Sequence, residues 1–132
     1  MKTEHQYGYS KTVNVPYEEA LVKIAEELKK EGFGVLTEID VKETLKKKLG
    51  VDFKKYKILG ACNPNLAYRA LSQETELGLF LPCNVIVYEN EIGKTVVSAI
   101  NPIVALSRID NPLLEPIAQE VSVRLQKVVA AL

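Results

Sequence analysis

Two cysteines are the side chains of this sequence best suited to chemistry. Cys62 and Cys83 are the only cysteines, each is followed by asparagine, and each has a proline within two residues. If the chain between them returns to its starting edge, both sulfurs meet, and redox chemistry, sulfur transfer or soft-metal binding becomes possible. Cys62 directly precedes an expected helix N-terminus, where N–H groups and the helix dipole favour a thiolate. We therefore take Cys62 as the candidate nucleophile and Cys83 as its resolving thiol.

A structural role for the same cysteines is the interpretation we favour, because free cysteine is among the residue types most often buried. Asn63 and Asn84 could supply amide donors around the sulfurs, although Asn63 also fits the N-cap of a helix. A zinc or copper site has less support, because two thiolates need further ligands and His5 is the only histidine. We therefore predict no metal site and no cofactor.

A pair of carboxylates is the second candidate site. Glu38 and Asp40 lie two residues apart near the end of an expected strand, so their side chains share one face of the sheet. Such a pair could act as acid and base, or could bind a cation. Asp40 also forms a capping box with Glu43, three residues further on, and this favours a structural role for the pair.

A basic segment is the third candidate. Between Lys42 and Lys57 the chain has seven lysines and only Glu43 and Asp52 as acidic residues. Such a segment could attract an anion or a nucleic-acid backbone. No aromatic platform and no glycine-rich phosphate loop is interleaved with these lysines, so nucleic-acid binding is the function we favour least.

The elements expected from hydrophobic periodicity and capping signals place the cysteines at strand ends. The expected strands cover residues 11–15, 33–39, 56–61, 85–88 and 95–100. The expected helices cover residues 17–30, 41–49 and 64–73, a short stretch from 102, and a long one from about 114 to 130. Cys62 then ends the third strand and Cys83 precedes the fourth, so the two meet only if these strands are antiparallel neighbours.

The length and charge of the chain limit the function classes. The 132 residues fit a single domain, with residues 1–9 expected as a flexible N-terminal segment. Lysine plus arginine and aspartate plus glutamate both number 17, so no overall charge favours nucleic acid or an anionic membrane. No apolar run is long enough to cross a membrane, and the polar start lacks the apolar core of a secretion signal. We therefore expect a cytoplasmic protein.

The expected hairpin at residues 85–100 indicates a second subunit. Both of its alternating sets of side chains are largely apolar, for example Val85 and Val87 on one face and Ile86 and Tyr88 on the other. Helices on one face of a sheet would leave one of these sets in water. Because the helices look too few to cover both faces, we expect a homodimer.

Four motifs of this sequence resemble one family. They are the stretches at residues 38–42, 59–67 and 81–85, and the closing Asn101-Pro102. The family is the uncharacterised prokaryotic family named domain of unknown function 302, and the resemblance covers residues 10 to 131. It implies a single α+β domain of two layers similar to the TATA-binding-protein-like class, with one curved, mainly antiparallel sheet of about five strands, a long C-terminal helix packed on it, and a dimer. It implies no established activity.

Three functions follow from these observations, and whether the protein is an enzyme stays open. The favoured function is a non-catalytic homodimeric module that binds a small ligand or a partner protein. The alternative is a thiol-dependent redox or sulfur-handling protein that uses Cys62 and Cys83. Nucleic-acid binding through the lysine segment comes last.

Overall fold

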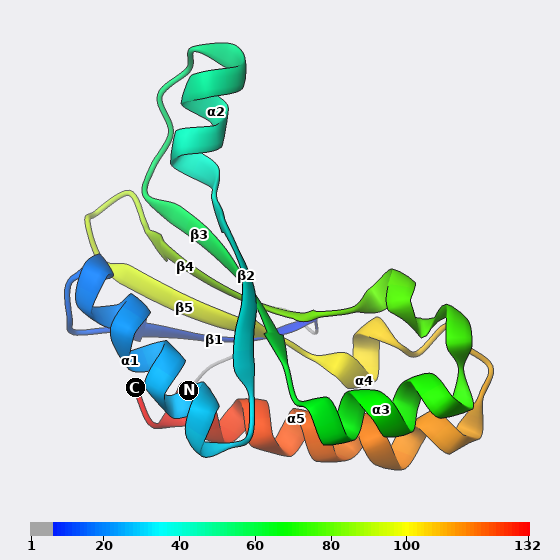
Figure 1. The fold of residues 1–132 in the computed structure, drawn as a ribbon. Coiled ribbons are helices and arrows are strands. Elements are labelled where there is room, and N and C mark those ends of the chain that lie inside the picture. Colours follow the sequence, from blue (N-terminus) through cyan, green and yellow to red (C-terminus); the bar gives the residue numbers. More distant parts are fainter. Residues whose placement is uncertain (1–6) are drawn as a thin grey trace.

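A five-stranded antiparallel sheet forms the centre of the computed structural model, which describes residues 7–132 (Figure 1). The strands are β1 (Gly8–Val13), β2 (Gly34–Asp40), β3 (Tyr56–Cys62), β4 (Cys83–Glu89) and β5 (Thr95–Ile100). Their order in the sheet is β1-β5-β4-β3-β2, so β1 and β2 are the edge strands. The α+β class, the antiparallel sheet and its strand number are therefore confirmed.

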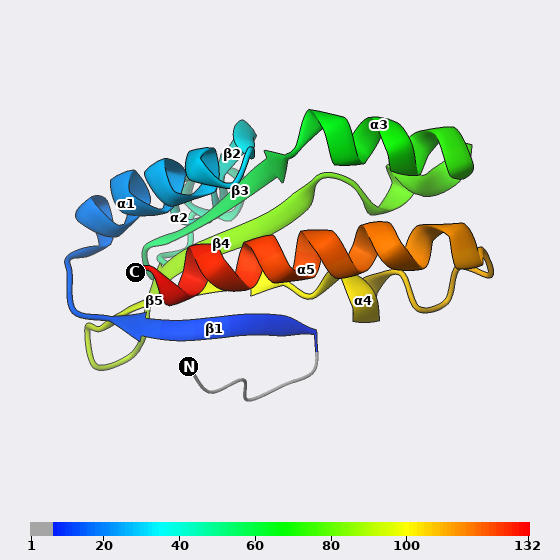
Figure 2. The ribbon, with the colours of Figure 1, turned by 90° about the horizontal axis from the view of Figure 1, so that it is seen from below.

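The three longest helices lie on one side of this sheet (Figure 2). The helices are α1 (Tyr17–Lys30), α2 (Val41–Leu49), α3 (Pro64–Gln73), α4 (Pro102–Ala105) and α5 (Glu115–Ala130), with 3₁₀ helices η1 (Thr75–Phe80) and η2 (Pro112–Leu114). Helices α1 and α5 lie over the sheet, α3 lies beside α5, and α2 projects from the end of β2 and β3 (Figures 1 and 2). Among the described residues, no helix has the length and apolar character needed to cross a membrane.

The hydrophobic core lies between the sheet and helices α1 and α5. Burial alternates along the central strands, as expected for a sheet with one covered face. The buried members of the core on that face include Leu59, Ala61, Val85, Val87, Val97 and Ala99. Ile24 and Leu28 of α1 and Leu125 of α5 are completely buried against them. The alternate positions of the same strands, such as Ile58 and Ile86, are only half-buried.

Side-chain caps explain where two of the helices begin. The Oδ1 atom of Asp40 accepts the backbone N–H of Glu43 at 3.0 Å and caps α2. The Oδ1 atom of Asn63 accepts the backbone N–H of Leu66 at 3.3 Å and caps α3. Each cap satisfies a backbone donor that the first helical turn would otherwise leave unpaired.

The N-terminal region differs from its prediction. Strand β1 begins at Gly8 rather than at residue 11, and Tyr9 is buried with its hydroxyl hydrogen-bonded to Ser122 of α5. The segment expected to be flexible therefore overlaps a strand, because Tyr9 has an apolar ring and a polar partner on α5. Residues 1–6, His5 among them, lie outside the described residues.

Candidate functional site

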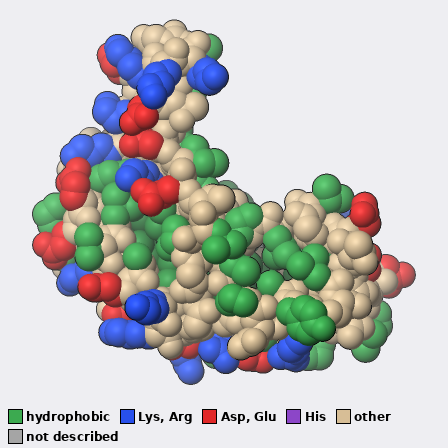
Figure 3. Space-filling view, in the orientation of Figure 1, with side chains coloured by type: hydrophobic (Ala, Val, Ile, Leu, Met, Phe, Trp, Pro, Cys, Tyr) green, Lys and Arg blue, Asp and Glu red, His purple; other side chains and the backbone are tan. Residues whose placement is uncertain are grey.

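An apolar cavity of about 390 Å³ lies where the sheet meets α3, η1 and α5. Residues typical of its walls are Phe33, Ala61, Leu66, Leu77, Leu114 and Val121. No charged side chain lines the cavity within the described residues, and only Thr37 and Asn63 bring a side-chain oxygen or nitrogen to it. Hydrophobic side chains surround the hollow between the sheet and the lobe formed by η1 and α3 (Figure 3). A volume of this size is typical of a small-molecule pocket.

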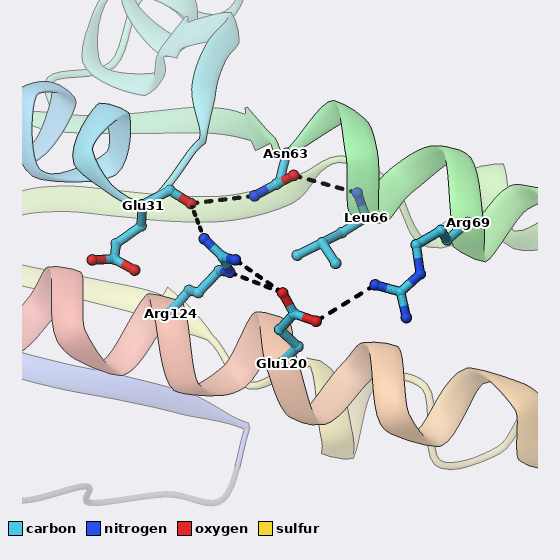
Figure 4. A network of polar contacts seen from close by, with 6 residues as sticks. All are labelled: Glu31, Asn63, Leu66, Arg69, Glu120 and Arg124. Atoms are coloured by element: carbon cyan, nitrogen blue, oxygen red, sulfur yellow. Dashed lines mark hydrogen bonds and ion pairs between the residues drawn. The ribbon is translucent and has the colours of Figure 1, made fainter.

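A polar network holds the helices that form the cavity wall (Figure 4). The backbone oxygen of Glu31, at the end of α1, accepts Nη1–H of Arg124 at 3.0 Å and Nδ2–H of Asn63 at 3.2 Å. Glu120 of α5 accepts Nη2–H of Arg124 at 2.9 Å and Nη1–H of Arg69, on α3, at 3.5 Å. The hydrogen bond from Arg124 is the main reason that the pKa of Glu120 is lowered. The network thus joins α1, α3 and α5.

Gly60 allows two parts of the cavity wall to approach β3. A Cβ atom at this position would lie 2.6 Å from Cγ of Pro82 and would overlap Oγ1 of Thr37. Both neighbours line the cavity. Any larger residue would therefore push β2 or the Pro82 segment outward.

The two cysteines do not form the predicted pair. Strands β3 and β4 are antiparallel neighbours as required, but the Cα partner of Cys83 is Ala61, while that of Cys62 is Gly34. Both cysteines are free, both contribute to the cavity wall, and they are not near each other. Since successive strand residues point to opposite faces, an offset of one residue is enough to separate two side chains. The prediction that the sulfurs converge is therefore wrong.

Cys83 is a protonated thiol at neutral pH. Burial, and to a smaller extent the negative charge that Cys62 would carry as a thiolate, together raise the pKa of its thiol to about 11. Because the thiolate is the nucleophilic form, this environment does not activate Cys83. It suits a small, weakly polar side chain in an apolar wall.

The asparagines predicted to surround the sulfurs have other positions. Asn63 is buried, and both ends of its amide are used, by Leu66 and by Glu31. Asn84 is exposed, its Cα partner is Gly60, and its side chain does not line the cavity. Asn63 therefore positions α3, and Asn84 is not part of this site.

The carboxylates of Glu38 and Asp40 make structural contacts. Glu38 accepts a hydrogen bond from Lys57 at 2.8 Å, and Asp40 caps α2. In residues 7–132 no three histidine, cysteine, aspartate or glutamate side chains are grouped so that they could hold a metal ion.

Acidic partners occupy much of the lysine segment. Lys46 pairs with Asp52, Lys47 with Glu43, Lys55 with Glu18 and Lys57 with Glu38. Helix α2, which carries several of these lysines, buries none of its residues. The positive charge of the segment is therefore largely balanced on an exposed surface.

Sequence reasoning missed the cavity itself. Its best signal is the occurrence of small residues on helix faces that pack inward. Ala67 and Ala70 of α3 and Ala118 of α5 all line the cavity, and small side chains there leave space that leucine would fill.

Comparisons with known proteins agree with the resemblance found in the sequence. Residues 9–132 match the family described as "Domain of unknown function DUF302". The crystal structure of an uncharacterised conserved DUF302 protein from Bacillus stearothermophilus is similar, with a TM-score of 0.89 and 34% sequence identity. That similarity covers 96% of this chain and 98% of the other. None of the curated proteins matches the chain. By its sequence match and its structural likeness, this chain belongs to the DUF302 family.

Proposed function

We propose that this protein binds a small, neutral, apolar molecule in the cavity between the sheet, α3 and α5. The observation that carries the proposal is a hollow of about 390 Å³ with almost entirely apolar walls. The hollow is open to solvent on one side, since Leu36 and Leu71 of its wall are exposed, so a ligand can enter it. An apolar hollow of this size is explained better by an occupant than by packing alone.

Among the described residues no charged side chain lines the cavity, and this determines which ligands it can bind. An ionised group would lose its hydration without gaining a partner, which is costly. The thiol of Cys83 can offer a weak S–H donor, since burial raises its pKa to about 11. These features favour an aromatic or aliphatic compound with at most one weak acceptor.

The thiol-dependent alternative has less support than ligand binding. It needs Cys83 as a partner for Cys62, but the two residues are not near each other and Cys83 is held as a thiol. The paired carboxylates, which could have supplied an acid and a base, are engaged with Lys57 and with the start of α2. Binding without catalysis therefore remains the favoured function.

A cytoplasmic location is part of this proposal. Cys62 and Cys83 are free thiols, and free thiols persist in reducing compartments.

The test uses N-phenyl-1-naphthylamine, a neutral apolar fluorophore that brightens when it leaves water. We expect saturable binding to the native chain. The substitution Ala67→Phe fills the cavity from α3 and should weaken binding about tenfold or more. The matched control is Ala130→Phe, which makes the same change at an exposed end of α5 outside the cavity.

A second cavity variant distinguishes a filled cavity from a misfolded protein. Leu71→Trp, at a more exposed position of the cavity wall, should also weaken binding while the circular dichroism spectrum stays native. Fluorophore binding that is absent from the native chain, or that is equal in all variants, contradicts the proposal.

A further inference from the structure

The open face of the sheet carries a second hollow. Its volume is about 530 Å³, its lining comes mainly from β1, β3, β4 and β5, and it shares no lining residue with the apolar cavity. A row of Cα partners, Ile58, Ile86, Ser98 and Ser10, crosses the sheet on this face. The helices α1 and α5 lie on the opposite face (Figure 2). This hollow is therefore a separate feature of the fold.

Aromatic rings form one wall of the second hollow. Tyr56 and Tyr88 are Cα partners on β3 and β4, and their rings stack with centroids 5.4 Å apart and planes at 14°. The ring of Phe53 lies 6.2 Å from that of Tyr56. Stacked rings offer a flat surface onto which another planar ring can pack.

The ammonium group of Lys54 lies at this wall. The Nζ atom of Lys54 lies 5.6 Å from the ring centroids of both Phe53 and Tyr88. Within residues 7–132, Lys54 has no carboxylate partner, in contrast to Lys55 and Lys57, its neighbours in the sequence. No aspartate or glutamate lines the hollow in that part of the chain. Its electrostatic character therefore favours an anion.

The floor of the hollow adds neutral hydrogen-bonding groups. The hydroxyls of Ser10 and Ser98 are hydrogen-bonded to each other at 2.8 Å, and the exposed amide of Asn84 lies on the same face. Burial raises the pKa of Tyr56, with smaller contributions from Tyr88 and Tyr7, so this phenol stays uncharged at neutral pH. A ligand with both donors and acceptors finds partners here without meeting a negative charge.

We propose that the open face of the sheet binds a planar aromatic anion. The ring packs against the stacked Tyr56 and Tyr88, and the negative group lies at the ammonium of Lys54. A free aromatic carboxylate and a nucleotide share this chemistry. The site is independent of the apolar cavity, whose walls exclude charge.

The experiment compares 2-naphthoate with 2-naphthamide, which differ in charge and keep the same rings. Each compound is titrated into the full chain at low salt. Calorimetry gives its affinity, and the NMR chemical shifts of the backbone amides show where it binds. We expect the carboxylate to bind about tenfold more tightly than the amide, with shifts centred on Tyr56, Tyr88 and Ser98. If adenosine 5′-monophosphate binds more tightly than 2-naphthoate, the site is assigned to nucleotides. If it binds more weakly, the site is assigned to aromatic acids.

A pair of lysine variants tests the role of charge. Lys54→Gln should remove the preference for the carboxylate, whereas Lys48→Gln, at an exposed lysine of α2 outside the hollow, should keep it. Three outcomes overturn the proposal. They are equal binding of the two naphthalenes, an unchanged preference in Lys54→Gln, and amide shifts on this face that follow protein dilution instead of ligand.

Discussion

Cys83 stands at the first position of β4, in the wall of the apolar cavity, where burial raises the pKa of its thiol to about 11. With that pKa, roughly one molecule in ten thousand carries the thiolate at neutral pH. Thiol chemistry needs the thiolate, and the register of β3 and β4 gives Cys83 Ala61 as its partner rather than Cys62. At this residue the structure supports a packing or ligand-contact role.

The raised pKa of Cys83 predicts a loss of stability at alkaline pH. The unfolded thiol has a pKa of 9.0, so above that value the unfolded chain releases a proton that the folded chain retains. The stabilising contribution is therefore complete below about pH 9 and is lost as the pH rises toward 11. Between about pH 8 and pH 10 the free energy of unfolding should fall by about 1 kcal/mol from this group.

Urea unfolding of the reduced protein measures this effect, with Cys83→Ala as the comparison. The variant should be less stable overall, because a cavity-lining side chain is truncated, but its stability should change less over the same pH range. Keeping the pH below 10 avoids Tyr17, whose pKa burial raises to about 12. Identical pH profiles of the two proteins would show that the thiol is not desolvated.

At the scale of elements, the position of α3 decides whether the cavity exists. The side chain of Asn63 fixes the position of α3 through two hydrogen bonds. Its oxygen caps α3, and its amide nitrogen donates to the backbone oxygen of Glu31. The cap is a local feature, while the contact with the end of α1 joins residues that are 32 positions apart. Asp40 caps α2 in the same way, but α2 projects away from the cavity.

The two caps therefore make a matched pair of substitutions. Asn63→Ala should lower the free energy of unfolding by about 2 kcal/mol, since a cap and a buried hydrogen bond are both lost. Asp40→Ala should lower it by about 0.5–1 kcal/mol, because only an exposed cap is lost. Binding of N-phenyl-1-naphthylamine should weaken in the first variant alone. Equal effects of both variants on binding would show that α3 is held by other contacts.

The same elements show what the sequence could and could not predict. The caps at Asp40 and Asn63 and the turn closed by Gly93 depend on neighbouring residues, so patterns of a few positions predicted α2, α3 and the β4–β5 hairpin. Residues 74–81, in contrast, belong to none of the helices and strands expected from the sequence, but they contain η1. Leu77 is buried there through tertiary contacts that a local pattern does not encode.

The candidate site was predicted in part for the same reason. Sequence reasoning made the meeting of the two cysteines conditional on β3 and β4 being antiparallel neighbours. The structure meets that condition, but a shift of one residue in their register decides which residue lies opposite Cys83. The polar network from Glu31 through Arg124 to Glu120 joins three helices and has no local signature. Likewise, Tyr56 belongs to the lysine segment, but only the pairing of β3 with β4 brings Tyr88 to stack on it beside Lys54.

At the scale of the whole molecule, the part of the sheet that no helix covers is where a homodimer interface is expected. The centre of the open face is more polar than the sequence suggested, because Ser10, Ser98 and Asn84 lie there. The edge strand β2 exposes more apolar surface than the centre of the open face does, since Leu36 is 67% exposed and Ile39 is 49% exposed. An exposed apolar edge strand is a template for pairing with another chain. The homodimer therefore stays a prediction, and β2 is the surface that favours it.

Sedimentation velocity at micromolar concentrations tests this prediction on the full chain. We expect a dimer that dissociates in Ile39→Glu, because a carboxylate at the interface would lose its hydration. Val22→Glu is the matched control, since Val22 is 59% exposed on α1 and does not belong to β2, and its substitution should leave the dimer intact. A native chain that sediments as a monomer contradicts the prediction. A dimer that survives Ile39→Glu would move the interface away from β2.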